Sequence, residues 1–313
     1  MGFTNFPNGI TSLGIPTFGT GGIPPFTGNY FFVEEVTTAG VAAGQGTAQS
    51  PFNTLDQALA QCVAGNNDVV FLIGTVHVTA TVAWSKNNTH LIGLCAPSDN
   101  DRARISASGA TVFTPLVNVT ASGCIFMDIA TFHGFANASA QICWAEAGGR
   151  NFYQGCQFLG MGNATAAAQT GGRSLTIAGS GENKFYDCTI GLDTISRGVA
   201  NASLELLSAT PRNVMRGCIF QMLASASTPL HITVGSGGMD RYLLLDKCSM
   251  INCVDSGGST ISAAIVANAS AGGTVLVQDG FSVGATAIAT TGPVRGTGNI
   301  PTATTSGIAI ALT

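Results

Sequence analysis

From residue 69 onward, short apolar runs alternate with turns rich in glycine, asparagine, serine and aspartate. Runs of this length, rich in β-branched and aromatic residues and bounded by such turns, are typical of β-strands. Residues 175–177 and 184–186 form one such pair of runs, and residues 204–207 and 214–215 form the next. The pattern therefore predicts strands throughout this region.

One segment ahead of the strands has helical spacing instead. A single face of that helix would carry residues at intervals of three and four, namely Leu55, Ala58, Leu59 and Cys62. Asn53 or Thr54 can cap its start, and Thr54 together with Gln57 fits a capping box. Gly65 is a suitable C-terminal stop. We expect this short helix to cover the open end of the stack that the strands build.

The strand region repeats with a period of about thirty residues, and cysteine marks the period. Six cysteines follow a turn at the same place in each repeat: Cys95, Cys124, Cys156, Cys188, Cys218 and Cys248. Successive positions are 29, 32, 32, 30 and 30 residues apart, and a further step of 32 reaches Gly280. Apolar runs before and after each late cysteine, with a third run further upstream, indicate three strands per repeat.

A repeat of three strands is too small to bury its own inner face, so such repeats stack and share a continuous core. The sequence therefore predicts an all-β fold, a right-handed parallel β-helix with three strands per coil and about eight coils. The repeating cysteine would occupy an inward-facing corner that suits a small apolar side chain. Free cysteine is among the most buried residue types.

The pattern divides the chain into four segments. Residues 1–29 form an extended arm, residues 30–68 a first strand and the cap helix, residues 69–280 the β-helix, and residues 281–313 a C-terminal cap or interaction segment. Proline and glycine exclude regular structure from the arm, yet its bulky apolar residues are costly to leave in water. We expect partner contacts from Phe3, Phe6, Ile10, Ile15 and Phe18 in the arm, and from Ile308, Ile310 and Leu312 in a final strand.

Composition narrows the range of partners. Charged residues make up only 9% of the chain, far below the usual quarter of a globular domain. The net charge is -4 and no basic stripe occurs, so nucleic acid binding is not expected. No apolar run has the length of a membrane span, and the N-terminus lacks the pattern of a secretion signal. The nine cysteines are therefore expected to be reduced.

Because β-helices often carry carbohydrate-active sites, the carboxylates are the first candidates for chemistry. Asp99 and Asp101 share one polar turn, where Ca²⁺ binding would need several converging oxygens and a solvated turn is the simpler interpretation. Glycoside hydrolysis needs a carboxylate pair at a defined separation, but Asp187 and Asp246 stand two repeats apart. His133 and the glycine after it match only a fragment of the polygalacturonase pattern.

Metal chemistry has no better basis in the sequence. The four histidines are far apart and lack the spacing of Cys/His metal sites. Cysteines stacked along one axis do not form the tetrahedron that thiolate metal sites require. We therefore expect no catalytic residue, no metal and no cofactor.

The coil region resembles the pectin-lyase-like β-helix superfamily. The resemblance covers residues 50 to about 280 and rests on the helix from Thr54 to Cys62 and on the repeat. It implies the fold, but the enzymatic residues of that superfamily do not carry over, because the matching positions are absent. Residues 3–10 (FTNFPNGI) and 28–33 (GNYFFV) resemble the start of structural proteins of tailed-phage virions.

This second resemblance implies a component of a phage virion. The leading hypothesis is a non-enzymatic capsid decoration (cement) protein that docks on the major capsid protein through its arm. Such a protein would be assembled in the bacterial host cytoplasm and carried in the virion, and by analogy with viral β-helices we expect a homotrimer. Two alternatives stay open: a fibre or spike that binds host glycans, and a polysaccharide lyase or hydrolase.

Overall fold

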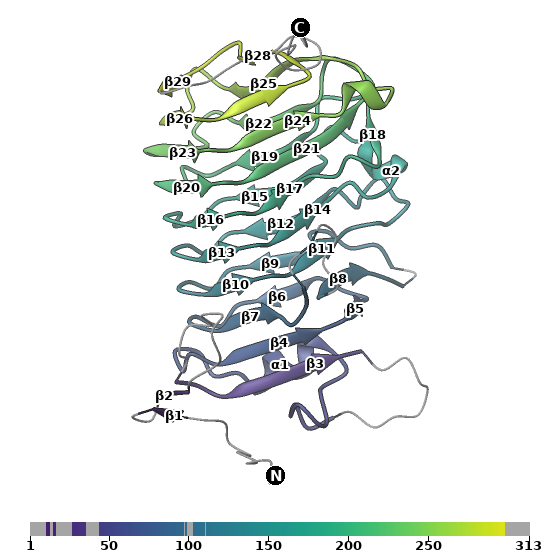
Figure 1. Cartoon of the computed structure of the whole chain (residues 1–313), viewed down its shortest axis with the longest axis vertical. Helices are drawn as coiled ribbons and strands as arrows, with labels where there is room; N and C mark the ends of the chain where they lie inside the picture. Colours follow the sequence, from purple (N-terminus) through teal and green to yellow (C-terminus); the bar gives the residue numbers. More distant parts are fainter. Residues whose placement is uncertain are drawn as a thin grey trace, which may run out of the picture.

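The computed structural model describes residues 27–35, 44–96, 98, 103–109 and 111–297, together with the backbone of residues 11–12 and 15–16. Within these residues the chain winds through three parallel sheets and climbs by one strand of each sheet per turn (Figure 1). The fold is a right-handed parallel β-helix, as the sequence predicts. The smallest of these three sheets holds eight strands and the stack has about seven turns, close to the expected eight coils.

The first sheet has ten strands and forms one long face of the stack. Its strands, in order from the N-terminal end, are β3 (Tyr30–Glu34), β4 (Val69–Ile73), β7 (His90–Gly93), β10 (Ile125–Met127), β13 (Phe152–Gln154), β16 (Lys184–Tyr186), β20 (Asn213–Arg216), β23 (Tyr242–Asp246), β26 (Thr274–Gln278) and β29 (Val294–Thr297).

The second sheet has nine strands. They are β5 (Thr75–Val78), β8 (Arg104–Ala107), β11 (Ala130–Phe132), β14 (Gln157–Leu159), β17 (Thr189–Ile190), β21 (Ile219–Ala224), β24 (Ser249–Asn252) and β27 (Phe281–Val283), with β18 (Ser196–Arg197) beside β21. The third sheet comprises β6 (Val82–Trp84), β9 (Val117–Val119), β12 (Ile142–Glu146), β15 (Arg173–Ile177), β19 (Ala202–Leu206), β22 (Leu230–Val234), β25 (Ile261–Ala267) and β28 (Ala285–Ala289).

Five short elements complete the described structure. They are the helices α1 (Leu55–Gln61) and α2 (Ala164–Ala167), the 3₁₀ turn η1 (Val254–Ser256), and the strands β1 (Thr11–Ser12) and β2 (Ile15–Pro16), which form an antiparallel pair. This pair lies in the arm, so the expectation that the arm has no regular structure is wrong there. The sheets continue past residue 280, where loss of the cysteine period predicts the end of the β-helix. That boundary is wrong, because β27, β28 and β29 add parallel strands in all three sheets.

Helix α1 lies at the N-terminal end of the stack, as expected. Thr54 and Gln57 form the predicted capping box, in which each side chain accepts a hydrogen bond from the backbone of the other residue. Leu55 and Ala58 are buried against the first coil. The Lys86 ammonium donates hydrogen bonds to carbonyls at the C-terminal end of the helix. A local cap and one lysine therefore hold the helix over the end of the core.

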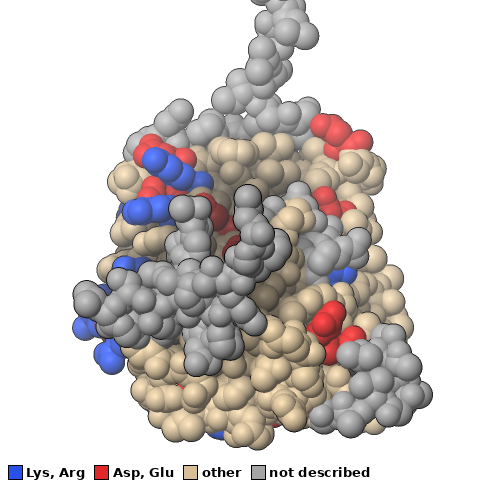
Figure 2. Space-filling model, turned by 60° about the horizontal axis from the view of Figure 1, so that its bottom comes forward, with Lys and Arg blue, Asp and Glu red and all other residues tan. Residues whose placement is uncertain are grey.

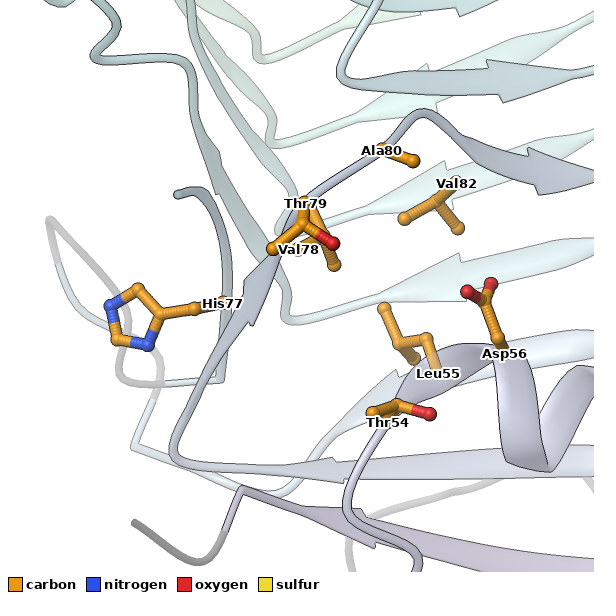
Figure 3. Close-up of a pocket in the computed structure, with 8 residues that line it drawn as sticks. All are labelled: Thr54, Leu55, Asp56, His77, Val78, Thr79, Ala80 and Val82. Carbon is orange, nitrogen blue, oxygen red and sulfur yellow. The ribbon is translucent and has the colours of Figure 1, made fainter. Parts of the chain in front are cut away.

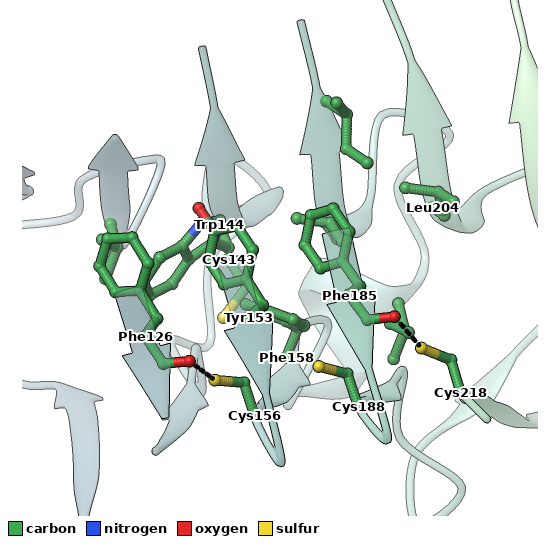
Figure 4. Close-up of a cluster of buried hydrophobic side chains, with 14 of the residues drawn as sticks. Phe126, Cys143, Trp144, Tyr153, Cys156, Phe158, Phe185, Cys188, Leu204 and Cys218 are labelled. Carbon is green, nitrogen blue, oxygen red and sulfur yellow. Dashed lines mark hydrogen bonds between the residues drawn. The ribbon is translucent and has the colours of Figure 1, made fainter. Parts of the chain in front are cut away.

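The core is built from side chains that stack in register from coil to coil (Figure 4). Phe126 pairs with Tyr153, and Tyr153 with Phe185, so the three rings lie over one another with centroids 4.8 and 4.4 Å apart. Trp144 meets the Tyr153 ring edge-on from the third sheet. Parallel in-register strands force such columns, because equivalent positions are only about 4.8 Å apart along the stack.

Four cysteines form a second column at the corner after the ten-stranded sheet. In register, Cys156, Cys188, Cys218 and Cys248 lie one above the next, and all are at most 1% exposed. The residue before each has a left-handed backbone, as at Asp187 with a φ of 53°. This turn points the next side chain into a tight corner that suits a small residue. All nine cysteines are free.

The expected ladder is wrong for its first two members. Cys124 precedes β10, whereas Cys156 follows β13, and the pairing of Ile125 with Phe152 places Cys124 beside Asn151. Cys95 lies beyond β7 and is half-buried. The reason is unequal coil length, since β10 and β13 are 27 residues apart in register although the two cysteines are 32 apart.

Asparagines form a buried column at the corner where Cys124 lies. The Oδ1 of Asn183 accepts a hydrogen bond from the backbone N–H of Asn151, and Asn213 does the same for Asn183. Asn151 in turn accepts from the N–H of Cys124 at 2.8 Å. All three amides are at most 1% exposed. The column supplies acceptors for corner N–H groups that have no strand partner, which would otherwise be costly to bury.

Candidate interaction surface

The outer face of the ten-stranded sheet is apolar over its first four strands. Alternate residues of a strand point to opposite faces, so the neighbours of inward-facing Val70, Leu91 and Phe126 point outward. We call these seven outward residues the outer apolar patch: Tyr30, Phe32, Val69, Phe71, Ile92, Ile125 and Met127. They form a cluster of their own, separate from the core inside the β-helix.

The centre of the outer apolar patch is buried although it lies on the outside of the coil. Val69 is 0% exposed, and Phe71 and Ile92 are each 3% exposed. The Phe71 ring stacks with Tyr30 and Phe32, with ring centroids 6.0 and 5.1 Å away. An open sheet face leaves more of such side chains exposed, so other atoms of the same chain cover these three.

One of the two outward rows of this face becomes polar beyond β10. The row that contains Met127 continues on the following strands with Gln154, Tyr186, Arg216 and Asp246. Arg216 donates to Asp246 at 2.7 Å, and its guanidinium lies 5.4 Å from the centre of the Tyr186 ring. The other outward row continues from Ile125 through Phe152, Lys184, Val214, Leu244 and Leu276 and stays mostly apolar, so only one of the two rows becomes polar.

The root of the N-terminal arm is fastened beside the patch. Asp68 is fully buried, and its Oδ1 accepts hydrogen bonds from the backbone and the side-chain amide of Asn29 at 2.6 and 3.1 Å. The other carboxylate oxygen accepts from the N–H of Val63, just after helix α1. One carboxylate thus ties the start of β3 to the capped end of the stack.

A histidine lies in the same row of the sheet as Val69. His90 is 2% exposed, and its Nδ1 accepts a hydrogen bond from the N–H of Ile125 at 3.0 Å. Burial lowers the pKa of His90 to about 4, and the nearby carboxylate of Asp68 only partly opposes this shift. His90 is therefore neutral near pH 7 and compatible with an apolar surrounding.

A pocket lies between the start of helix α1 and strand β5 (Figure 3). Its titratable side chains are Asp56 and His77, which lie on opposite sides of it. His77 instead faces Glu35, with its Nδ1 2.9 Å from the carboxylate. The pocket therefore lacks the paired groups that acid–base catalysis requires.

The other residues considered for catalysis are dispersed. Asp99 and Asp101 lie outside the described residues. Asp187 forms a corner turn. Asp246 lies two coils further along the stack and forms an ion pair with Arg216 of the coil between them. His133 is fully buried, and its Nε2 lies 3.0 Å from the carbonyl of Phe113, as in a packing histidine. Among the residues with assigned positions, no cluster of three or more His, Cys, Asp or Glu could hold a metal ion.

The stacked cysteines are poorly suited to nucleophilic chemistry. Burial raises the pKa of Cys188 and Cys218 well above the ordinary value, and a neighbouring cysteine raises each further. Figure 4 shows that Cys156 and Cys218 donate to the carbonyls of Phe126 and Phe185, at 3.3 and 3.4 Å. A thiol held protonated inside the core is a structural group.

The residues predicted to bind partners fall mostly outside the described structure. For Ile15 only the backbone is described, in β2. The predicted residues that lie wholly outside the described structure are Phe3, Phe6, Ile10, Phe18, Ile308, Ile310 and Leu312. The outer apolar patch was not predicted, although the sequence holds a signal for it. The runs YFFVE, VVFLI and IFM are apolar at consecutive positions, which is typical of strands buried on both faces.

The surface at the N-terminal end carries few charges. In Figure 2 most of the described atoms are uncharged, with small groups of acidic and basic side chains near the margins. No helix in the described ranges is long and apolar enough to cross a membrane.

Comparison with known proteins identifies the fold. No family model and no curated protein sequence matches the chain. Among solved structures, a pectin methylesterase from Aspergillus niger is similar with a TM-score of 0.58 and 14% identity, over 88% of this chain and 86% of that one. A pectate lyase has a TM-score of 0.55 and 10% identity, over 90% of this chain and 79% of that one.

Two further structures extend the comparison. A rhamnogalacturonan lyase is similar with a TM-score of 0.55 and 13% identity, over 82% of this chain and 68% of its own. The ORF18 protein of Geobacillus virus E2 has a TM-score of 0.41 and 10% identity, over 79% of this chain and 57% of that one. At these identities the likeness of the first three shows the shared β-helix fold, and the fourth is too distant to bear on function.

Proposed function

We propose that this chain is a non-enzymatic structural protein of a phage virion, namely a capsid decoration protein that docks on the major capsid protein through its N-terminal arm. The observation that carries the proposal is the N-terminal arm. It is rich in large apolar residues, its root at Asn29 is bound by the buried carboxylate of Asp68, and it belongs to a protein with few charges. Such a combination fits permanent assembly better than turnover of a soluble substrate.

Two further observations support the proposal. The titratable groups of the described β-helix do not converge as hydrolysis or lyase chemistry requires, because Asp187 and Asp246 serve a turn and an ion pair. Residues 3–10 and 28–33 resemble the start of tailed-phage structural proteins. We further propose self-association as a homotrimer, assembly in the bacterial host cytoplasm and final location in the virion, with no cofactor.

The proposal is tested on particles of the phage that encodes the chain. Electron microscopy at side-chain resolution should find three-strand coils on the outside of the head, with Phe3, Phe6 and Ile10 against the shell protein. Removing residues 1–24 should leave a folded chain that no longer binds heads lacking it. Particles without the protein, or full binding by the truncated chain, would contradict the proposal.

One observation favours glycan binding as a second candidate function. In the polar row of the outer face, Tyr186, Arg216 and Asp246 present an aromatic ring beside paired charges, and the Phe152 ring meets Tyr186 edge-on at 5.3 Å. Aromatic rings with hydrogen-bonding groups around them suit sugar rings. Binding of the purified chain to an acidic polysaccharide, lost in Tyr186→Ala and kept in Phe281→Ala, would favour this function, whereas cleavage would favour an enzyme.

A further inference from the structure

We infer that the outer apolar patch is covered by the proximal part of the chain's own N-terminal arm, residues 17–26, which packs back over the outside of strands β3, β4, β7 and β10. The first argument is the burial already described. Val69, Phe71 and Ile92 point away from the core, yet they retain between 0 and 3% of their surface. Side chains on an open sheet face keep far more, so the patch requires a cover.

The second argument is the place where the arm begins. Asp68 fixes Asn29, and the next residue, Tyr30, is itself the first member of the patch. Every residue upstream of Asn29 is therefore tethered within reach of the apolar face. A tethered segment has an effective concentration in the millimolar range, which favours it over a second copy of the chain at ordinary concentrations.

The third argument is the chemistry of the arm. The first charged side chain of the sequence is Glu34, so residues 1–33 contain no Lys, Arg, Asp or Glu. An apolar surface can accept such a segment without desolvating a charge. Phe18, Ile23 and Phe26 supply bulky side chains for it close to the root. Repeated glycine and proline in residues 17–26 let this part of the arm follow a sheet surface without forming a helix.

The fourth argument is length. The patch crosses four strands, which span about 14 Å along the stack. Ten extended residues reach about 33 Å. Residues 17–26 are thus long enough to cover the patch, which leaves the distal part of the arm, with Phe3, Phe6 and Ile10, free for another molecule. This inference concerns the isolated chain and does not depend on the proposed function.

The test is a photo-crosslinker placed at position 18 of the full-length chain, irradiated at low protein concentration. We expect a product of monomer mass in which residue 18 is joined to a peptide containing Phe71 or Ile92. The matched control carries the crosslinker at position 281, on the remote strand β27, and should give no product with those peptides. A product of dimer mass, or one joined to another surface, would overturn the inference.

A second measurement keeps the test independent of crosslinking yield. Removing residues 1–26 should leave the β-sheet circular dichroism unchanged but raise the fluorescence of an apolar dye several-fold. A synthetic peptide of residues 1–29 should reverse the rise. In the truncated chain Ile125→Ser should lower the dye signal, whereas Ile219→Ser, on another sheet, should not. Unchanged dye binding on truncation would refute the inference that the arm covers the outer apolar patch. A chain that covers its patch but is absent from virions would refute only the proposed function.

Discussion

The hydroxyl of Tyr153 donates a hydrogen bond to Oε2 of Glu146 inside the closed coil, where neither side chain is more than 1% exposed. The Nδ2 of Asn151 donates to both oxygens of the same carboxyl, at 3.0 and 3.1 Å. The asparagine column and the aromatic stack therefore meet at one buried acid. No Lys or Arg within ion-pair distance compensates it among the residues placed in the structure.

This acid should make stability depend on pH. Burial raises the pKa of Glu146 to about 7, although the hydrogen bonds from Tyr153 and Asn151 lower it. Because the folded-state pKa lies above the unfolded value, the stabilisation is complete below about pH 4.5 and is lost as pH rises to about 7. The loss is on the order of 3 kcal/mol. Urea titrations from pH 4 to 8 should show that Glu146→Gln gains stability over the unmodified chain across this window.

The comparison with Glu146→Gln is needed because His90 acts in the opposite direction. Its pKa of about 4 lies below the unfolded value, so its contribution is lost as pH falls from about 6.5 through 4. Only the difference between the two chains isolates the carboxyl. A difference that is constant from pH 4 to 8 would show that Glu146 titrates normally.

Thiol reactivity should separate the cysteine column from Cys95 and Cys253. In the native protein we expect rapid labelling of Cys95 and Cys253, the two that are not fully buried. Cys188 and Cys218 should resist, because burial raises their pKa and excludes the reagent. After denaturation without reductant, all nine should react. Mass spectrometry of labelled peptides gives the order, and rapid native labelling of Cys188 would contradict the column.

The buried guanidinium of Arg197 should destabilise the fold. Arg197 is 1% exposed and donates only to Ser203 Oγ at 3.2 Å and Met161 Sδ at 3.8 Å, with no carboxylate in ion-pair distance in the described part of the chain. Burial lowers the pKa of Arg197 to about 9, so it still carries its charge at pH 7. We expect Arg197→Met to raise the free energy of unfolding by about 1–4 kcal/mol.

The control for this substitution is Arg173→Met. Arg173 does have a partner, Glu205, at 2.8 Å. Breaking that pair leaves a partly buried carboxylate uncompensated, so this variant should be less stable than the unmodified chain. If Arg197→Met is destabilising to the same degree, the Arg197 guanidinium contributes through packing or through a partner such as bound water.

Substitution of Asn183, the middle residue of the asparagine column, should lower the stability of the fold. Asn183→Ala removes the acceptor for the N–H of Asn151 and the side-chain donor to Asn213, whose Oδ1 still accepts from the backbone N–H of residue 183. The N–H of Asn151 is then buried without its acceptor, so we expect a loss of about 1–3 kcal/mol. Asn118→Ala, on the half-buried face of β9, should change stability by less than about 0.5 kcal/mol. Equal effects of the two substitutions in urea titrations would remove the column's special role.

Several features follow from local sequence alone. The capping box of Thr54 and Gln57 involves neighbours three residues apart, so the start of helix α1 can be predicted without the rest of the chain. The left-handed corner before Cys188 or Cys218 requires a turn residue followed by a small side chain, and this pair recurs along the sequence. Repetition of that corner was enough to predict a three-stranded β-helix.

The sequence by itself determined the cap helix, the repeating corner and therefore the β-helix fold. Only the tertiary structure decided which residues share a column, because strands pair through hydrogen-bond register and not through a fixed sequence interval. Leu91 pairs with Phe126 after 35 residues, whereas Ile125 pairs with Phe152 after 27. Loops of unequal length therefore moved Cys124 into the asparagine corner. The outer apolar patch likewise exists only once β3, β4, β7 and β10 lie side by side.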